Sequence, residues 1–426
     1  MGVRNNMTKK IIIRAPLLSR SGYGEHARMV VDALSQHPDK FDLYVENVGW
    51  GQMPWITDFS HKRKYYDMII AKKHSYNGPF DLGIHVSIPP EFTVMAPKNI
   101  GFTAGIESNL VPPAWLAKCS EMDLLVVTSQ HAATGFKGTV HVQHPETGEK
   151  VAVTYGKPIQ IINYPIKNLQ AEDMSAKIDL DTDFNFLSIA QWGPRKNVDN
   201  MLKWFVEEFQ NDEVGLVLKT SRVKNNLADR QMCSAMIKSL AEKFPNKKCK
   251  IHLLHGTMSD EEIHGLYKHP KIRAYVTTTH GEGYGLPLFE AAYSEMPVIA
   301  TGWSGHLDFL CIEKKTPKGK VKREALYEKI SYSLEPIQKE AEWPGVLDPG
   351  TKWAYAKENS FKKAIRKVYQ NISLFERRAK TLSDSLRSTH TEQQIQDQVV
   401  HTVLSVIGDS KEQSDWQDKI ETVETL

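Results

Sequence analysis

The sequence lacks any apolar run long enough to cross a membrane. The apolar cluster near the N-terminus, residues 11–13, consists of Ile11, Ile12 and Ile13, whereas a spanning helix needs roughly 18–20 apolar residues. The same cluster is too short for the core of a secretory signal peptide. The four cysteines show neither a paired nor a metal-binding spacing: Cys119, Cys233, Cys249 and Cys311. These absences predict a cytoplasmic protein in a reducing compartment, with no integral membrane contact.

A strong net charge is also missing, because the formal charge is +3 at pH 7. That value does not identify a nucleic-acid partner. Cations nevertheless gather in two stretches, 62–73 and 314–323. The first holds Lys62, Arg63, Lys64, Lys72 and Lys73 against Asp67, and the second holds Lys314, Lys315, Lys318, Lys320, Lys322 and Arg323 against Glu313. Such clusters are most often solvated loops, and otherwise they bind polyanions. Both interpretations stay open at this point.

The 426 residues are enough for two domains of ordinary size. One stretch near position 280 organises the second domain. Residues 274–279 are β-branched or aromatic, as in a buried strand. Three glycines at 281, 283 and 285 then allow a sharp turn, and Pro287 suits the first turn of a helix. With the strand-like residues 297–301, the pattern predicts strand, glycine-rich turn, helix and strand.

Two carboxylates flank this turn. Glu282 lies within it, and Glu290 lies about one turn into the predicted helix. A carboxylate accepts two hydrogen bonds and can hold a diol, while a helix N-terminus favours an anion. Together they would suit a nucleotide sugar. The alternative is a plain strand-to-helix junction with two solvated glutamates, because short glycine patterns give many false matches.

The whole run from His280 to Pro287, followed by residues 290–292, 297–299 and 304–305, closely resembles the donor-site signature of retaining GT-B glycosyltransferases of family 4. Glu282 and Glu290 match the Glu-x7-Glu pattern of that family. The resemblance implies an α/β fold of two Rossmann-like, doubly wound domains facing a cleft. It implies that Glu282 is catalytic and that Glu290 binds the donor, a nucleoside-diphosphate sugar, with UDP favoured. Weaker resemblance covers most of residues 10–375.

The resemblance also assigns further donor-binding residues to the second domain. They are Gly283, Tyr284, Gly285 and Leu286 in the turn, and Thr257 in the corner 254–258, which resembles the nucleobase-binding corner of the family.

The loop 191–197 carries two adjacent cations before a predicted helix. Arg195 can bind a phosphate through two nitrogens, and Lys196 supplies a point charge, as a diphosphate leaving group requires. Solvated loop cations are the alternative. Lys196 matches the lysine that the family places at the end of this loop and is assigned a catalytic role. The family's early arginine is replaced here by Gln191, so Arg195 is assigned as the possible substitute.

The first domain opens with a strand at 10–14, a glycine-containing loop and a helix from about 25 to 36. The loop resembles the GT-B loop that borders donor phosphate and acceptor, so Gly22 and Gly24 are assigned to the donor and His26 to the acceptor side. A tight turn is the alternative. In the same family a histidine and an acidic residue after successive strands reach the cleft, which favours His85 as catalytic and Glu107 on the acceptor side. A structural histidine is the alternative for His85.

Composition and pattern divide the chain into a first domain at 1–165, a polar linker at 166–183, a donor domain at 184–375 and helices with an acidic tail at 376–426 that cross back. Residues 138–157 alternate around a turn and predict a β-hairpin. Its histidines are not assigned to a metal. We recognise no Asp-x-Asp metal site, so we expect no cofactor and no required metal.

The resemblance implies transfer with retention of anomeric configuration, by front-face displacement in which the leaving phosphate accepts the acceptor's proton. Three readings of the function stay open. The chain weakly resembles bacteriophage glycosyltransferases that modify DNA, so the favoured acceptor is hydroxymethylated cytosine in phage DNA, held by the basic clusters. The alternatives are a surface polysaccharide or lipid glycan and a non-catalytic sugar-nucleotide-binding protein. The sequence does not indicate an oligomeric state.

Overall fold

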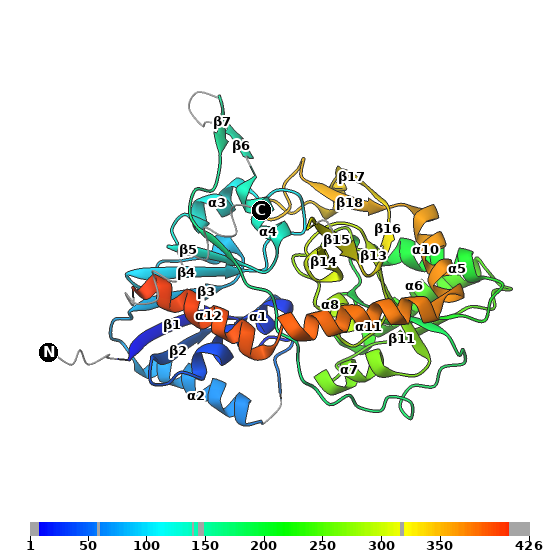
Figure 1. The fold of residues 1–426 in the computed structure, drawn as a ribbon, viewed down its shortest axis with the longest axis horizontal. Coiled ribbons are helices and arrows are strands. Elements are labelled where there is room, and N and C mark those ends of the chain that lie inside the picture. The colour runs from blue at the N-terminus through cyan, green and yellow to red at the C-terminus, as the bar shows by residue number, and fades with distance from the viewer. Residues whose placement is uncertain (1–7, 58–59, 139, 144–148, 316–318, 409–426) are drawn as a thin grey trace. The chain divides into compact units, whose positions relative to one another are not determined.

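The computed structural model describes residues 8–57, 60–138, 140–143, 149–315 and 319–408 of the chain (Figure 1). These residues form two compact units. The first contains residues up to 106, residues 110–165 and the segment from His390 onward, and the second contains residues 107–109 and 166–389. The second unit therefore includes the stretch 166–183, which forms no helix or strand, and it extends past residue 375 to Thr389.

The first unit is built on a parallel sheet of six strands in the order β2-β1-β3-β4-β5-β8. The strands are β1 Lys9–Ala15, β2 Phe41–Asn47, β3 Leu82–Val86, β4 Lys98–Thr103, β5 Leu124–Val127 and β8 Ile159–Ile161. Strands β3 and β5 are buried along their whole length, as expected for the centre of a doubly wound sheet. The order 2-1-3-4-5 is that of flavodoxin-like sheets, whose ligand crevice lies at the carboxyl ends of β1 and β3.

Helices and short elements complete the first unit. They are α1 Gly22–Ser35, α2 His61–Ser75, η1 Pro89–Glu91, α3 Pro113–Cys119, α4 Gln130–Lys137, the antiparallel hairpin of β6 Val140–Gln143 and β7 Lys150–Val153, and α12 Glu392–Ile407. Helix α12 packs against α1 (Figure 1). The hairpin matches the predicted one, although the turn residues 144–148 lie outside the described residues.

The second unit has a parallel sheet in the order β11-β10-β9-β12-β13-β16. The strands are β9 Asn185–Gln191, β10 Gly215–Ser221, β11 Lys250–Leu254, β12 Ile272–Val276, β13 Val298–Thr301 and β16 Glu328–Ile330. Numbered within this sheet, the order is 3-2-1-4-5-6, the strand order of dinucleotide-binding domains. The direction of winding reverses between β9 and β12, so a ligand crevice is expected at their carboxyl ends.

The remaining elements of the second unit are η2 Pro194–Lys196, α5 Val198–Phe209, α6 Leu227–Glu242, α7 Asp260–Lys268, α8 Leu286–Tyr293, α9 Leu307–Leu310, β14 Cys311–Lys315, β15 Val321–Ala325, β17 Tyr332–Pro336, η3 Lys339–Ala341, β18 Lys352–Ala356, α10 Glu358–Gln370 and α11 Ile372–Thr389. An apolar core built from β9, β10, α5 and α10 includes Phe186, Phe205, Phe209 and Phe361. Helix α11 packs on α8, and Ser383 donates a hydrogen bond of 2.8 Å to the carbonyl of Tyr293 at the end of α8.

Three local expectations differ from the structure. Helix α1 begins at Gly22, because Ser21 caps it by accepting a hydrogen bond from the N–H of Gly24, so the two glycines lie in the first turn and not in a loop. The cations at 62–73 lie on helix α2. The expected basic loop after Leu310 is an antiparallel hairpin of β14 and β15. None of the helices that the structure describes is long and apolar enough to span a membrane.

Candidate functional site

Two loops at the carboxyl ends of β9 and β12 are held together by hydrogen bonds. The loop after β9 ends at Asn197, and the loop after β12 contains His280. The N–H of His280 donates to the carbonyl of Arg195 at 2.8 Å, and Thr278 Oγ1 donates to the carbonyl of Asn197 at 3.1 Å. These bonds place residues 195–197 beside the glycine-rich turn, as the reversal of strand order predicts.

Two glycines fit the turn to its neighbours. A Cβ on Gly281 would lie 2.0 Å from the carbonyl oxygen of Glu107, so no other residue fits there without moving the backbone. Gly285 is the N-cap of α8 and has a φ of 100°, in the left-handed region that favours glycine. Glu282 lies between them, and its N–H donates to Ser304 Oγ at 2.9 Å. The turn therefore packs closely against the backbone of Glu107 and is held by the hydroxyl group of Ser304.

Glu282 is the centre of a buried ionic cluster. Its side chain is 8% exposed, and Oε1 lies 2.5 Å from Lys196 Nζ while Oε2 lies 3.1 Å from Arg195 Nη1. Burial by itself would raise the pKa of Glu282, but the charges of Lys196 and Arg195 outweigh that effect and lower it to about 2. Glu282 is thus a carboxylate at neutral pH. The structure brings three of the predicted site residues within contact distance.

Arg195 joins a fourth predicted residue to this cluster. Its Nη2 lies 3.3 Å from Glu107 Oε1, and its Nη1 donates to the carbonyl of Gly281 at 2.7 Å. Residues 107–109 belong to the second unit, where Lys352 N–H donates to Asn109 Oδ1 at 2.6 Å. Burial would lower the pKa of Arg195, but Glu107 and Glu282 raise it, so the guanidinium stays charged. The cluster contains two cations and two carboxylates.

Lys196 differs from Arg195 in its response to burial. Burial lowers the pKa of Lys196, and the attraction of Glu282 opposes that change without cancelling it. An ammonium in this position is held mainly by one carboxylate. A phosphate oxygen that approached Lys196 would add a second negative partner and favour the charged form.

Glu290 lies in a different environment, on helix α8. Its Oε2 accepts a hydrogen bond of 3.1 Å from Tyr267, whose hydroxyl also lies 3.2 Å from the carbonyl of Pro287. A small cavity opens beside it, lined by Lys167, Leu169, Asp260, Ile263, His264, Tyr267, Glu290 and Tyr293. Glu290 is half-buried and faces hydroxyl-bearing and charged groups, which suits the binding of a diol.

The other assigned donor residues have different surroundings. Tyr284 is 3% exposed and packs against Phe289 and Phe309, with ring centroids 5.3 and 4.9 Å away, so its ring belongs to the core. Leu286 is partly exposed at the start of α8, after Gly283 and Gly285. Thr257 is exposed at the corner after β11. The donor roles of these residues stay predictions.

Gln191, at the family's early arginine position, does not enter the ionic cluster. Its Nε2 donates to the carbonyl of Arg222 at 2.8 Å at the end of β9. Arg195 contacts Glu282 directly, as described above. Arg195, and not Gln191, is therefore the residue of this loop that joins Lys196 at Glu282.

The predicted residues of the first unit are histidines and glycines at the start of α1 and the end of β3. His85 is 1% exposed, and its Nε2 accepts a hydrogen bond of 3.2 Å from the N–H of Thr93. Its Nδ1 has no hydrogen-bond partner among the described residues. Burial lowers the pKa of His85 to about 4, so the ring is neutral at pH 7 and carries its proton on Nδ1.

His26 is more deeply enclosed than His85. Its side chain has no exposed surface, and its ring lies 5.7 Å from that of Phe102 and 5.4 Å from that of Tyr164. Burial lowers its pKa to about 3. Neither ring nitrogen has a hydrogen-bond partner in the part of the chain that the structure describes. Its acceptor-side role stays a prediction, and it would require the surrounding side chains to move.

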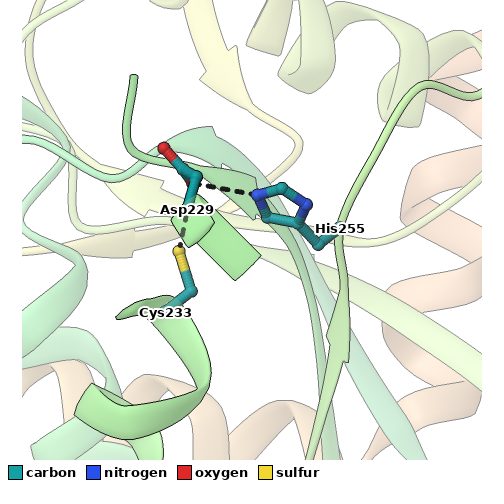
Figure 2. Close-up of side chains that lie close together, drawn as sticks. All are labelled: Asp229, Cys233 and His255. Carbon is teal, nitrogen blue, oxygen red and sulfur yellow. Dashed lines mark hydrogen bonds and ion pairs between the residues drawn. The ribbon is translucent and has the colours of Figure 1, made fainter. Parts of the chain in front are cut away.

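One cluster was missed by the sequence analysis. Asp229 lies between Cys233 and His255, as Figure 2 shows, with Oδ1 2.9 Å from His255 Nε2 and 3.6 Å from Cys233 Sγ. The three residue types and their spacing in space resemble a metal site. Asp229 also accepts hydrogen bonds from the backbone N–H groups of residues 222, 223 and 224, at 2.9, 2.7 and 3.0 Å.

These bonds make the cluster a structural one. Burial would raise the pKa of Asp229, but the three backbone donors and His255 lower it strongly, and they occupy the oxygen lone pairs that an ion would need. Burial raises the pKa of Cys233 to about 11, which disfavours the thiolate that binds metals. Asp229 therefore holds the turn after β10 to the corner after β11.

The sequence contains two overlapping Asp-x-Asp spacings, formed by Asp179, Asp181 and Asp183. All three residues are exposed and precede the amino end of β9. Glu282 lies at the opposite, carboxyl end of the same sheet. The three aspartates are therefore not part of the ionic cluster, and metal independence stays an untested prediction.

The cations at 62–73 are better compensated than the sequence suggested. Lys62 pairs with Asp32 at 2.7 Å, Arg63 pairs with Asp67 at 3.0 Å, and Lys72 pairs with Asp42. Asp32 and Asp42 are distant in sequence and were not counted against the cluster. In the second cluster Lys314 pairs with Glu324 at 2.5 Å, while Lys318 lies outside the described residues. The case for a polyanion at 62–73 is correspondingly weaker.

Residues 170–336 match the family model described as "Glycosyl transferases group 1". The matched segment contains Arg195, Lys196, Glu282 and Glu290. No curated protein sequence matches the chain.

The fold is similar to solved structures. Sucrose-phosphate synthase from Thermosynechococcus elongatus superimposes with a TM-score of 0.60 and 12% identity, over 94% of this chain and 100% of that one. Anabaena Alr3699/HepE, in complex with UDP and glucose, superimposes with a TM-score of 0.53 and 12% identity, over 93% of this chain and 100% of that one. The structure described as "Trehalose-6-phosphate from E. coli bound with UDP-2-fluoro glucose" superimposes with a TM-score of 0.56 and 10% identity, over 92% of this chain and 98% of that one. Two Rossmann-like domains of the GT-B type are thus confirmed, and the matched domain confirms the predicted enzyme class, a glycosyltransferase.

Proposed function

Starting from a group 1 glycosyltransferase domain at residues 170–336, we propose that the protein transfers a sugar from a nucleoside-diphosphate sugar to a hydroxyl group, with retention of anomeric configuration. The observation that carries the proposal is the ionic cluster of Glu107, Arg195, Lys196 and Glu282 at the carboxyl ends of β9 and β12. It lies where a doubly wound sheet binds its ligand.

The two cations are suited to a diphosphate leaving group. Arg195 and Lys196 lie just before helix α5, and Glu282 precedes Gly285, the N-cap of α8. The residues of the cluster are therefore close in sequence to the N-termini of two helices. Positive charge and free N–H groups at helix N-termini both stabilise an anion whose charge grows as the glycosidic bond breaks. Glu282 balances that charge while no donor is bound.

The proposed step is a front-face displacement. The bond between the anomeric carbon and the phosphate oxygen breaks, and a bond to the acceptor oxygen forms on the same face. The proton of the acceptor hydroxyl passes to the leaving phosphate oxygen. Arg195 and Lys196 stabilise the phosphate, while Glu282 lies beside them to orient the hydroxyls of the sugar. No metal is required in this scheme.

Glu290 is proposed to bind the ribose of the nucleotide. Its carboxylate is fixed by Tyr267 and adjoins the cavity that Lys167 and Asp260 line. UDP is the favoured nucleotide because Anabaena HepE is in complex with UDP and glucose, and the E. coli structure is bound with UDP-2-fluoro glucose. Corner residue Thr257 is proposed to border the base.

The acceptor is a separate proposal. Hydroxymethylated cytosine in DNA remains a hypothesis, but its support at 62–73 is reduced by the ion pairs of Lys62, Arg63 and Lys72. A glycan acceptor needs no such cluster. A non-catalytic sugar-nucleotide binder is disfavoured by the intact set of Glu282, Lys196 and Glu290.

The test is a donor-hydrolysis screen with UDP-, GDP-, ADP- and dTDP-sugars, followed by NMR of the first sugar released. We expect one nucleotide to support hydrolysis and the released sugar to keep the donor's anomeric configuration, also in the presence of excess chelator. Lys203→Ala serves as a control, because Lys203 is an exposed cation on α5 that pairs with Glu207 at 3.8 Å. Release of the inverted anomer would end the retaining proposal, and loss of activity in chelator would end metal independence.

A further inference from the structure

A groove in the first unit has no role in the scheme above. Its volume is about 630 Å³, within the range of small-molecule sites. It lies beside the carboxyl ends of β1 and β2 and is lined by Leu18, Glu46, Asn47, Trp55, Arg63, Asp67, Ile70, Lys73 and His74. We propose that this groove binds a neutral saccharide, with a pyranose ring stacked on Trp55.

Trp55 supplies an exposed aromatic face in a fixed position. Trp55 is 48% exposed although it lies in a well-anchored loop. It pairs with Ser19 in an antiparallel bridge, and the N–H of Ile56 donates to the carbonyl of Leu18 at 2.8 Å. Arg63 also donates to the carbonyl of Ile56. Because the backbone on both sides of Trp55 is tied down, the indole presents its apolar face without a large ordering cost.

The polar groups of the groove are both acceptors and donors. Glu46 and Asp67 provide partly exposed carboxylates, 44% and 53% exposed, which accept hydrogen bonds from hydroxyl groups. Asn47 Oδ1 accepts the N–H of Leu18 at 3.0 Å, so this bond orients its amide group and leaves the two N–H donors to face other partners. A sugar hydroxyl both donates and accepts, so such a mixed lining suits it.

The charge balance of the groove favours a neutral ligand. Two cations, Arg63 and Lys73, are matched by two carboxylates, Glu46 and Asp67, with His74 as a further polar group. Both carboxylates are already paired, Asp67 with Arg63 at 3.0 Å and Glu46 with Arg14 at 3.6 Å. A polyanion such as DNA would meet two carboxylates here, whereas a sugar has no charge to repel. Leu18 and Ile70 add apolar surface for the C–H face of the ring.

The proposal rests on the chemistry of this groove and not on the donor-site assignment. Donor hydrolysis tests the proposed transferase function, whereas saccharide binding tests the role of the groove. One can therefore fail while the other holds. Neither Trp55 nor Asp67 belongs to the ionic cluster around Glu282.

The experiment is saturation-transfer NMR on the full chain with maltotetraose, cellotetraose and chitotetraose, and separately with a short DNA duplex. We expect at least one tetrasaccharide to receive saturation and the duplex to receive none that depends on Trp55. Trp55→Ala should weaken the binding roughly tenfold or more, and Trp55→Phe should retain part of it. Trp343→Ala is the matched control, because Trp343 is 61% exposed in the second unit.

Asp67→Asn is a second variant that keeps the shape of the groove and removes one charge, and it should weaken saccharide binding less than Trp55→Ala does. Melting temperatures close to that of the wild type would show that each variant is folded. The proposal is overturned if no tetrasaccharide binds the wild-type protein, if Trp55→Ala and Trp343→Ala bind equally well, or if the duplex binds in a Trp55-dependent manner. Trp55→Ala should hydrolyse the donor at the wild-type rate, whether or not it has lost saccharide binding.

Discussion

The two units share a doubly wound scaffold but place different chemistry at the carboxyl ends of their strands. The second unit concentrates two cations and two carboxylates there, centred on Glu282. The first unit places His26 and His85 there, both buried and both with pKa values lowered by burial, so neither is charged at neutral pH. One scaffold thus carries an ionic cluster suited to a diphosphate in one unit and two buried, neutral histidines in the other, so the fold by itself does not decide the chemistry.

The largest expected effect comes from removing a cation of the charged site. Lys196→Ala should lower kcat for donor hydrolysis by roughly 10²–10³-fold, as the loss of one group that stabilises a growing charge commonly does. KM should change much less, because the phosphate charge increases mainly in the transition state. Steady-state kinetics of the wild type, Lys196→Ala and Lys203→Ala would check this. A normal kcat with a raised KM would mean that Lys196 contributes only to binding.

The second effect concerns stability and depends on pH. Because the pKa of Glu282 is lowered to about 2, its ion pairs stabilise the folded state above the unfolded pKa of about 4.5 and lose that effect as pH falls toward 2. The full contribution is on the order of 3 kcal/mol. Urea unfolding of the wild type and Glu282→Gln should show a difference that is largest at pH 7 and shrinks below about pH 4.5. A difference that does not vary with pH would contradict the ionic cluster.

The stability that depends on the buried His85 should change with pH in a different range. The pKa of His85 is lowered to about 4, so the folded state binds fewer protons than the unfolded state between about pH 6.5 and 4. The wild type should therefore lose about 2 kcal/mol more than His85→Gln when the pH falls from 7 to about 4.5. His26 is unchanged in both proteins and acts as an internal control. Equal losses would show that His85 is not buried in its neutral form.

The smallest effect is expected from surface cations. On the DNA hypothesis, neutralising Lys320 and Lys322 together should flatten the salt dependence of DNA binding, by about 0.9 in log–log slope for each phosphate that the protein no longer neutralises. Donor hydrolysis should not change, because exposed cations contribute little to the rest of the fold. Lys62→Ala is the control, since Lys62 pairs with Asp32. A slope that is identical in the wild type and the double variant would remove the second cluster from the DNA hypothesis.

The residues of the charged site could be singled out from the sequence because their signals are local. The glycines around Glu282 and the cations at 195 and 196 lie in short runs that follow predicted strands, and parallel strands bring such loops to one edge. The contact between Arg195 and Glu107 could not be predicted, because residues 107–109 join the second unit only in the folded chain. The sequence analysis assigned Arg195 to the donor and Glu107 to the acceptor side, so it did not predict that they meet.

Other features left no local pattern. Asp229 is held by backbone N–H groups of residues 222–224, and backbone donors have no residue type to recognise. Helix α2 buries only Tyr66 and Ile69, so it lacks the apolar periodicity that would have predicted it. The acidic partners of its cations, among them Asp32, are distant in sequence, so the local pattern does not reveal them. The groove at Trp55 depends on the same helix and was missed for the same reason.

The most direct test of the central claim measures by calorimetry how tightly UDP and UMP bind to the wild type and to Lys196→Ala. If the donor screen selects another base, the diphosphate and monophosphate of that nucleoside replace UDP and UMP. If the ionic cluster around Glu282 binds the leaving diphosphate, the wild type should bind UDP more tightly than UMP, and Lys196→Ala should lose most of that preference while UMP affinity changes little. Equal losses for UDP and UMP, or no loss for either, would contradict the assignment of the cluster to the diphosphate.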